Sequence, residues 1–314
     1  MASMKAIRMH EYGGPDVLTL EEAPRPTAGE NEVLVRVHAA AVNPVDCVIR
    51  AGYAQGWFQH FMPRILGGDA AGVVEAVGPG VTAFKPGDAV FTRTNLLRDG
   101  TYAEYVVANT SEVAAKPRSL DFNQAAAVPH AFLTAYHTII NTANIKPGQT
   151  VLIHAAAGGV GHLAVQLAKQ RGARVIGTAS EKNMGFLKQI GVDQAIDYNS
   201  TPFENVVKDV DVVLDGVGGD TLERSYGVLK PGGLLMSIVQ PPDPAKAAAH
   251  GVRAEMVAAS PQTETVLAEA AKLIDAGKIK PEVSKLLPLS EIRQAHALSE
   301  SRHTRGKIVL QVLQ

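Results

Sequence analysis

The pattern of hydrophobic positions changes near the middle of the chain. Through about residue 120, β-branched runs such as 33–37 and 72–77 alternate with clusters of glycine and proline, a pattern typical of strands and turns. After residue 148, short apolar runs without polar alternation are separated by helical segments. Strands of that kind are buried on both faces, so they indicate a parallel sheet covered by helices. The chain is therefore predicted to be an α/β protein whose first part is rich in β-structure.

The elements after residue 148 follow one another regularly. The apolar runs predict strands at 151–153, 175–177, 210–214, 234–238 and 252–258. Helical spacing predicts helices at 162–171, 181–190, which Gly191 ends, and 222–229. The last sixty residues predict a helix that Ser260 caps and Gly277 ends, a second helix at 290–298 and a final strand at 307–312.

Composition and charge exclude several classes of partner. The 314 residues suffice for about two domains, and 30 basic against 31 acidic residues leave a formal charge of −1. This balance gives no reason to expect nucleic acid or an anionic membrane. Two uncharged stretches, 122–145 and 150–168, are interrupted by proline or glycine, so we interpret them as buried core rather than membrane spans. The start of the chain lacks the apolar stretch of a signal peptide, and we expect a cytoplasmic location.

Cysteine usage argues against a metal site. Cys47 is the only cysteine, so neither a disulfide framework nor a cysteine-rich zinc site fits within one chain. The ten histidines show no metal-ligand spacing either. We expect no metal.

The stretch 151–161 carries the most specific chemical signal. It reads as strand, tight turn and helix, the context that a dinucleotide fingerprint needs. Gly158 allows the backbone to approach a pyrophosphate, Gly161 allows the helix to pack close to the strand, and the helix N-terminus attracts phosphate. Ala156 replaces the first glycine of the usual G-x-G-x-x-G pattern. The turn Gly158-Gly159-Val160-Gly161 is predicted to bind a nicotinamide dinucleotide.

The end of the second strand distinguishes NADP from NAD. An acid there would bind the ribose 2′-hydroxyl and repel a 2′-phosphate, but Gly177-Thr178-Ala179-Ser180 occupies the position. Ser180 and Lys182 favour a phosphate through a hydrogen bond and a charge, unless Lys182 is only a solvated surface residue. Glu181 opposes this interpretation, although an acid also suits the first position of a helix. NADP(H) is the predicted cofactor.

Several motifs together resemble those of a known family. They are Tyr12-Gly-Gly-Pro15, Asn43-Pro44-Val45-Asp46 with Arg50-Ala51-Gly52, Gly67-Gly68-Asp69-Ala70-Ala71-Gly72, Lys85-Pro86-Gly87-Asp88, 154–161 and Gly306-Lys307-Ile308-Val309-Leu310. As a set, they resemble the medium-chain dehydrogenase/reductase superfamily in its zinc-independent quinone oxidoreductase branch. The zinc ligands of the zinc-dependent relatives match Asn43 and Gly68 here.

The resemblance implies a domain organisation. A GroES-like β-rich catalytic domain would span residues 1–125 and be completed by 260–314, with an NADP-binding Rossmann domain over 126–259. It also implies a homodimer formed by cofactor-domain strands that pair edge to edge, for which 252–258 is the candidate strand.

The resemblance places Asn43, Asp46 and Thr134 around the nicotinamide. Asn43 would donate hydrogen bonds to a carbonyl or to the carboxamide of the cofactor, and Asp46 would orient its neighbours, although these two residues also make a good turn. Tyr53 is either a proton donor, an aromatic wall of the site or an ordinary packed tyrosine. The family pattern often has a tyrosine where Val48 stands, which weakens any tyrosine-assisted mechanism.

Other residues are expected along the cofactor. Tyr198 would lie against the 2′-phosphate or be a simple strand-end aromatic, and Gly216-Val217 and Ile238-Val239 would border the two riboses at strand ends. From the C-terminal segment, Arg305 would either reach the cofactor phosphate or face solvent. Lys307 is expected among the cofactor-binding residues as well.

Two further features concern the substrate pocket. His130 either approaches the pocket or is a satisfied core histidine. The aromatic segment 50–64 is expected to line or cover it.

The implied reaction is hydride transfer from NADPH to an electron-poor acceptor. Without a metal to stabilise an alkoxide, a quinone or an α,β-unsaturated carbonyl is easier to reduce than a simple ketone. Two alternatives stay open: a reductase of enoyl thioesters or enals, and a protein that binds NADPH as a sensor without catalysis.

Overall fold

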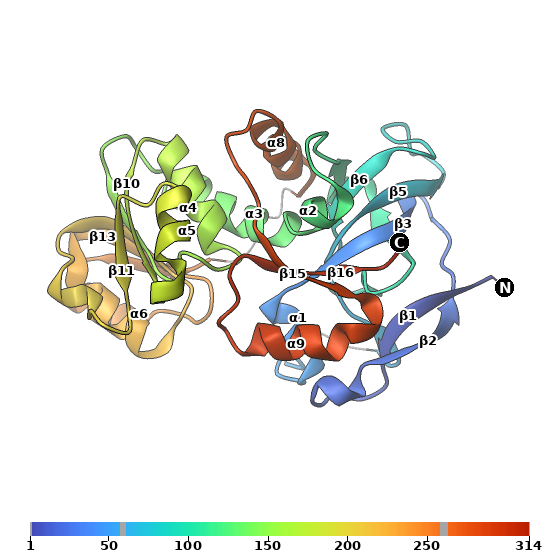
Figure 1. Ribbon diagram of the computed structural model, residues 1–314, viewed down its shortest axis with the longest axis horizontal. Helices are drawn as coiled ribbons and strands as arrows, with labels where there is room; N and C mark the ends of the chain where they lie inside the picture. Colours follow the sequence, from blue (N-terminus) through green and yellow to red (C-terminus); the bar gives the residue numbers. More distant parts are fainter. Residues whose placement is uncertain (1, 57–60, 258–262, 314) are drawn as a thin grey trace. The chain divides into compact units, whose positions relative to one another are not determined.

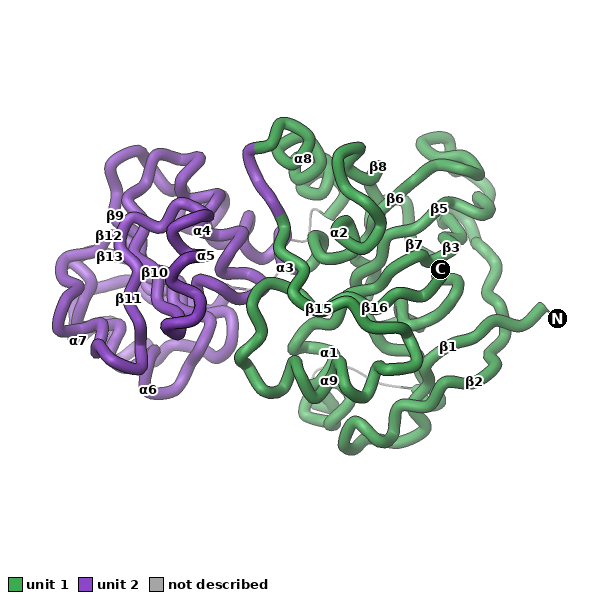
Figure 2. The backbone as a smooth tube through the Cα atoms, viewed as in Figure 1, with its two compact units in different colours: residues 1–130, 262–277, 281–314 green, residues 131–261, 278–280 purple. Residues whose placement is uncertain are grey.

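The structure is a computed structural model that describes residues 2–56, 61–257 and 263–313. The chain divides into two compact units (Figures 1 and 2). Unit 1 comprises residues 1–130, 262–277 and 281–314, and unit 2 comprises residues 131–261 and 278–280. The sequence placed the boundaries at 125 and 259. Residues 278–280 join unit 2 because Gln166 donates to the Lys280 carbonyl at 3.0 Å and accepts from its N–H at 2.8 Å.

Unit 1 is built on two sheets. The smaller has the order β2-β1-β4, and the larger has seven strands in the order β15-β16-β3-β5-β6-β8, with β7 also paired to β3. The predicted runs 33–37 and 72–77 lie in neighbouring antiparallel strands of the larger sheet. The bounds are β1 Ser3–Met9, β2 Thr19–Pro24, β3 Glu32–Val42, β4 Arg64–Ile65, β5 Asp69–Val77, β6 Ala89–Arg93, β7 Tyr105–Asn109, β8 Val113–Ala115, β15 Val283–Pro288 and β16 Lys307–Gln311.

Segments far apart in the sequence complete unit 1. Strand β16, near the end of the chain, pairs antiparallel with β3, and helices α1 and α9 pack against each other beside these strands (Figure 1). The predicted helix at 290–298 is α9. The predicted cap Ser260 lies outside the described residues. The bounds are α1 Pro44–Arg50, α2 Phe122–Ala126, α8 Thr263–Asp275, α9 Ile292–Glu300, η1 Pro15–Val17, η2 Thr110–Glu112 and η7 Leu289–Glu291.

Unit 2 contains one six-stranded sheet in which every pair of neighbours is parallel. Its order, β11-β10-β9-β12-β13-β14, is that of a dinucleotide-binding doubly wound sheet. The predicted parallel sheet is confirmed. The strand predicted at 252–258 is the edge strand β14, although Val257 lies beyond its end. The bounds are β9 Thr150–Ile153, β10 Arg174–Ala179, β11 Gln194–Asp197, β12 Val210–Asp215, β13 Leu229–Ser237 and β14 Arg253–Met256.

The helices of unit 2 depart from prediction in two places. The predicted helix 181–190 begins with a 3₁₀ turn, η4, before α5, and the predicted helix 222–229 begins earlier and ends at Ser225. Leu229 cannot extend that helix because it already pairs with Val210 in the sheet. The bounds are α3 Pro129–Tyr136, which spans the boundary, η3 His137–Thr142, α4 Gly161–Gln170, η4 Glu181–Asn183, α5 Met184–Gln189, η5 Phe203–Asn205, α6 Gly219–Ser225, η6 Tyr226–Val228 and α7 Pro244–Ala249.

Candidate cofactor and catalytic sites

The turn between β9 and α4 has the close packing that the glycine pattern predicts. A Cβ atom on Gly161 would lie 2.2 Å from the carbonyl oxygen of Ala155 and 2.9 Å from the Cα of Ala156. Neither backbone atom can move away cheaply, so only glycine allows the helix to begin this close to the strand. Ala155 itself has a φ of 50°, which turns the chain sharply after the strand.

The start of α4 is shaped to receive an anion. Val160, the N-cap residue, has no side chain that can cap the helix. The Gly158 carbonyl accepts from the His162 N–H at 3.1 Å and lies 2.8 Å from His162 Nδ1. The Gly158 carbonyl and the Gly159 N–H belong to the same trans peptide, so they point in opposite directions. Because the carbonyl points to the His162 N–H, the Gly159 N–H points away from the helix. The residues present therefore fit a diphosphate held by backbone N–H groups and the helix dipole.

The predicted 2′-phosphate residues gather at two neighbouring strand ends. Ser180 follows β10, and Tyr198 follows β11 and donates its N–H to the Ala179 carbonyl at 3.2 Å. Lys182 is exposed and Tyr198 is 49% exposed, so both side chains are open to a ligand.

The acids near this corner do not occupy the position that would select NAD. Glu181 is exposed at the first position of η4, as an acid at a helix start is expected to be. Asp197 Oδ1 accepts from the backbone N–H of Asn199 at 3.1 Å and from its side chain at 3.2 Å. Its carboxylate therefore stabilises its own turn.

Asp215, which the sequence reasoning missed, organises the next two strand ends. It is fully buried at the end of β12 and accepts from the N–H groups of Val217 and Gly218, both at 3.0 Å, and from Ser237 Oγ at 2.8 Å. It thus links the segments Gly216-Val217 and Ile238-Val239, which were predicted to border the cofactor. An acid that ends an apolar strand before Gly-Val-Gly-Gly was the available signal.

Thr134 belongs to unit 2 and is 4% exposed in α3. Its carbonyl accepts from Thr138 Oγ1 at 3.0 Å.

In unit 1, Asn43 and Asp46 open helix α1. The Asn43 N–H donates to Asp46 Oδ2 at 2.8 Å, so these two residues form the turn that their sequence predicts. Tyr102 also donates its hydroxyl to this oxygen at 2.7 Å. Asp46 Oδ1 is buried and has no hydrogen-bond partner among the described residues. Burial raises the pKa of Asp46 to about 6, against the opposing effects of the Tyr102 and Asn43 hydrogen bonds.

The Asn43 side chain lies between two opposite charges. Its Nδ2 donates to Asp69 Oδ2 at 3.0 Å, and its Oδ1 accepts from the Lys307 ammonium. Lys307 also donates to the Val42 carbonyl at 2.9 Å and lies 3.8 Å from Asp69 Oδ2. Asn43, Asp69 and Lys307 are at most 4% exposed.

Lys307, which is predicted among the cofactor-binding residues, has its contacts within unit 1. Its ammonium is buried among Asn43, Val42 and Asp69. Arg305 forms a 2.7 Å ion pair with Glu282 within unit 1.

His130 and Tyr53 have contrasting surroundings. The backbone N–H of His130 donates to Asp69 Oδ1 at 2.9 Å, and burial lowers the pKa of its ring to about 3, as for a neutral core histidine. Tyr53 is 80% exposed after α1. Of the segment 50–64, residues 57–60 lie outside the described residues, and Arg50 is buried in contact with His296 and Glu300.

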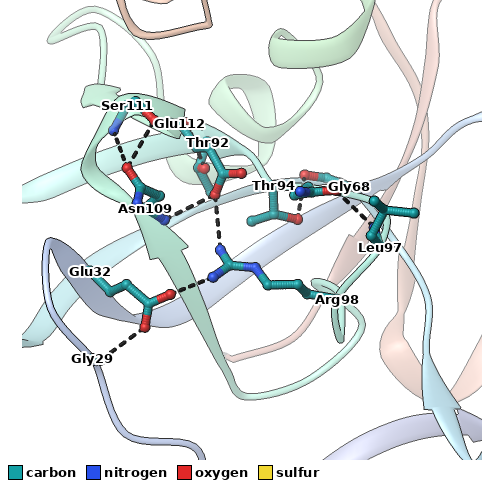
Figure 3. A network of polar contacts seen from close by, with 11 residues as sticks. Gly29, Glu32, Gly68, Thr92, Thr94, Leu97, Arg98, Asn109, Ser111 and Glu112 are labelled. Atoms are coloured by element: carbon teal, nitrogen blue, oxygen red, sulfur yellow. Dashed lines mark hydrogen bonds and ion pairs between the residues drawn. The ribbon is translucent and has the colours of Figure 1, made fainter. Parts of the chain in front are cut away.

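Gly68 is covered by the loop that follows β6. Its carbonyl accepts from Thr94 N at 2.8 Å and Thr94 Oγ1 at 3.3 Å, and a Cβ on Gly68 would lie 3.1 Å from Leu96. Figure 3 shows how Arg98 anchors this loop through ion pairs to Glu32 and, at 3.1 Å, to Glu112.

The described residues contain no group of three or more His, Cys, Asp or Glu side chains placed to hold a metal ion. Cys47 is buried with its Sγ 3.5 Å from His296 Nδ1, and burial raises the pKa of the thiol to about 12. A thiol that stays protonated is a poor metal ligand. Within the described ranges, no helix is long and apolar enough to cross a membrane.

The strand order and the glycine turn define a dinucleotide-binding α/β protein. Comparisons with known proteins agree. The family model "Alcohol dehydrogenase GroES-like domain" matches residues 29–118, and "Zinc-binding dehydrogenase" matches residues 190–310.

The chain is 34% identical to the quinone oxidoreductase of Sus scrofa, over 98% of this chain and 97% of that protein. Among solved structures, the quinone oxidoreductase from Coxiella burnetii superposes with a TM-score of 0.91 and 37% identity, covering 99% of this chain and all 100% of that one. A mycobacterial protein in complex with NADPH superposes with a TM-score of 0.88 and is 32% identical. The match covers 98% of this chain and 100% of that one. The chain belongs to the medium-chain dehydrogenase/reductase superfamily, in its quinone oxidoreductase branch, and is an oxidoreductase. The resemblance seen in the sequence, with its GroES-like and Rossmann-type folds, is confirmed.

Proposed function

We propose that this protein transfers hydride from NADPH to a quinone or an α,β-unsaturated carbonyl. The observation that carries the choice of cofactor is the corner formed by Ser180, Lys182 and Tyr198, which offers a hydroxyl, a cation and an aromatic ring to a 2′-phosphate. The mycobacterial relative, which contains NADPH, supports it. The quinone oxidoreductase relatives support the acceptor class.

The residues of unit 2 bind and orient the cofactor. Backbone N–H groups after Ile153 hold the diphosphate, and Asp215 fixes the strand ends that border the riboses. When bound, NADPH supplies a hydride, which carries two electrons and leaves NADP⁺, and one proton from solvent completes the reduction of the acceptor. Catalysis then rests on orientation and on stabilising the oxygen that gains charge.

In unit 1, the Asn43 amide supplies that stabilisation. Asn43 has two Nδ2 protons, and Asp69 accepts one of them. The other is the donor for the acceptor oxygen. Asp46 holds the backbone at Asn43 in place through its hydrogen bond with the Asn43 N–H.

An acceptor screen tests the proposal. Purified protein is mixed with NADPH and, in parallel, with a quinone, an enone, an enal or an enoyl thioester, and the loss of reduced-nicotinamide absorbance is followed. Fastest turnover of the quinone or the enone is expected. Preference for the thioester or the enal would favour a different reductase. NADPH binding without oxidation by any acceptor would favour a sensor.

We also propose that the protein is a homodimer joined along β14. This strand ends the sheet of unit 2, and its Met256 is 47% exposed. An exposed strand edge is a template for pairing with a second copy. Light scattering after size exclusion should give a dimer mass for the wild type and a monomer mass for Ala254→Pro, which removes a backbone donor from the edge.

A further inference from the structure

The Asp69–Lys307 pair stands out among the buried charges of unit 1. Both side chains are at most 4% exposed, and they lie 3.8 Å apart. Two charges removed from water are costly unless each finds good partners, so such a pair does not by itself explain stability. Both charges also contact Asn43 directly.

The larger sheet of unit 1 brings the three residues together. Strand β16 pairs with β3 so that Ile308 lies opposite Val42, which sets Lys307 beside Asn43. On the other side, β5 pairs with β3 so that Asp69 lies opposite Ala41. The three residues thus lie at the same end of adjacent strands, where the backbone fixes the position of each Cα.

Gly306 makes the placement of Lys307 possible. Its φ is 55°, and a Cβ there would lie 2.3 Å from the Glu282 carbonyl oxygen. The Lys307 N–H donates to that same carbonyl at 2.9 Å. The strand therefore starts at a defined residue, and the backbone position of Lys307 is fixed.

The charges decide which way the Asn43 amide faces. The oxygen and nitrogen of an asparagine side chain are nearly the same size, so packing alone does not select between the two orientations. An ammonium only donates and a carboxylate only accepts, so the amide oxygen must face Lys307 and the nitrogen must face Asp69. Reversing the amide would set a donor against a donor and an acceptor against an acceptor in a buried site.

We propose that Lys307, with Asp69 as its counter-ion, is a positioning residue that holds the Asn43 amide with its nitrogen toward the substrate and strengthens it as a hydrogen-bond donor. A cation on the amide oxygen polarises the group, and chains of hydrogen bonds strengthen one another in a buried site. This inference rests on the proposed function for its catalytic part, but the fixed orientation of the amide is a property of the protein alone.

The first experiment follows the amide without any reaction. In ¹⁵N-labelled protein, the side-chain NH₂ resonances of Asn43 are assigned by their loss in Asn43→Ala. Hydrogen exchange at this group is expected to be slow in the wild type and at least about tenfold faster in Lys307→Met, because the amide oxygen loses the ammonium that fixes its orientation and the NH₂ group is no longer held against Asp69. Rapid exchange in the wild type would overturn the inference, whether or not the protein reduces quinones.

The second experiment is a double-mutant cycle in the quinone assay. Asn43→Ala is expected to lower kcat about 100-fold, as for the loss of one oxyanion donor, and Lys307→Met about 10-fold or more. If Lys307 acts through Asn43, then Lys307→Met in the Asn43→Ala background changes kcat by less than about twofold. Independent, multiplying losses would mean a merely structural role and would contradict the proposal.

Controls separate this role from folding and from cofactor binding. Lys116→Met removes another unit 1 lysine whose ammonium donates to backbone carbonyls, those of Pro117 and Leu120, and kcat should not change.

Lys307→Met leaves the buried Asp69 carboxylate without its counter-ion, which can unfold the variant. In that case the double variant Lys307→Met/Asp69→Asn, in which both charges are removed, is used instead, and the same loss of kcat is expected. NADPH affinity, measured by fluorescence, should stay within about twofold in all variants. An inactive wild type that still protects the amide would refute the proposed function but not the positioning role.

Discussion

The two units build their candidate sites from different materials. In unit 2, the site consists mainly of backbone: glycines, a helix N-terminus and N–H groups ordered by Asp215. In unit 1, it consists of five buried side chains that come from four places in the sequence, Asn43 with Asp46, Asp69, Tyr102 and Lys307. A backbone site depends on shape and tolerates few added atoms. A charged side-chain site depends on the balance of its partners.

This contrast predicts the largest effect for an added methyl group in the unit 2 turn. Gly161→Ala places a Cβ 2.2 Å from the Ala155 carbonyl oxygen, so the turn must deform. We expect NADPH affinity to fall about 100-fold or more and stability to fall by about 1–3 kcal/mol. Cofactor titration and thermal unfolding measure the two effects. Gly185→Ala is the matched control, because a Cβ there meets nothing within 4 Å, and it should be neutral or slightly stabilising. Normal cofactor binding by Gly161→Ala would break the comparison.

The next effect concerns the charge balance of unit 1. The pKa of Asp46 is raised from 3.8 to about 6, so the folded state binds this proton more tightly than the unfolded state does. The resulting stability is present below about pH 4 and is lost as pH rises through 6. Asparagine does not titrate, so Asp46→Asn does not lose this stability as pH rises. The free energy of unfolding of the variant, relative to that of the wild type, should therefore increase by about 3 kcal/mol between pH 4 and pH 7. Urea unfolding at several pH values measures it.

A control of opposite sign sharpens this test. The hydrogen bonds from Lys85 lower the pKa of Asp88, a partly exposed carboxyl in the same unit. Stability from that carboxyl is present at neutral pH and is lost in acid. Asp88→Asn should therefore lose stability relative to wild type as pH rises. If the stabilities of Asp46→Asn and Asp88→Asn, each relative to wild type, change in the same direction with pH, then burial does not set the pKa of Asp46.

A moderate effect is expected at the 2′-phosphate corner. Replacing Ser180 and Lys182 together with alanine should raise the KM for NADPH about tenfold and leave the KM for NADH unchanged, because only NADPH carries the phosphate. Lys188→Ala, at an exposed position of α5, is the control and should change neither value. Equal losses for both cofactors would show that the corner does not contact the phosphate.

The smallest effect is expected on metal removal. The positions that match zinc ligands of the zinc-dependent relatives hold Asn43 and Gly68, and Cys47 stays protonated because burial raises its pKa to about 12. Prolonged dialysis against a chelator should change kcat by less than about twofold, and elemental analysis should find no stoichiometric zinc. Restoration of lost activity by zinc would contradict this.

Much of unit 2 was readable from the sequence. The signals there are local: apolar runs, glycines at 158 and 161, and the absence of an acid at 180. The apolar runs correctly predicted strands that correspond to β9, β10, β12 and β13. Asp215 was missed although it ends one of these strands. Its role depends on Ser237, which lies 22 residues away.

The site in unit 1 was only partly readable. Asn43 and Asp46 are neighbours in the sequence and were found together, but nothing in the pattern around Tyr102 pointed to Asp46. For Lys307, the sequence shows a charge at the start of a C-terminal strand but not which residues surround that charge in space. Lys307 and Asn43 are 264 positions apart in the sequence, and the pairing of β16 with β3 brings them together.

The sequence by itself determined the parallel sheet, the glycine turn and the family, because these follow from local spacing and from which residues a backbone conformation permits. Only the tertiary structure decided which charges face one another, since the energy of a buried charge depends on neighbours within a few ångströms in space. For Asn43, those neighbours are Asp69 and Lys307.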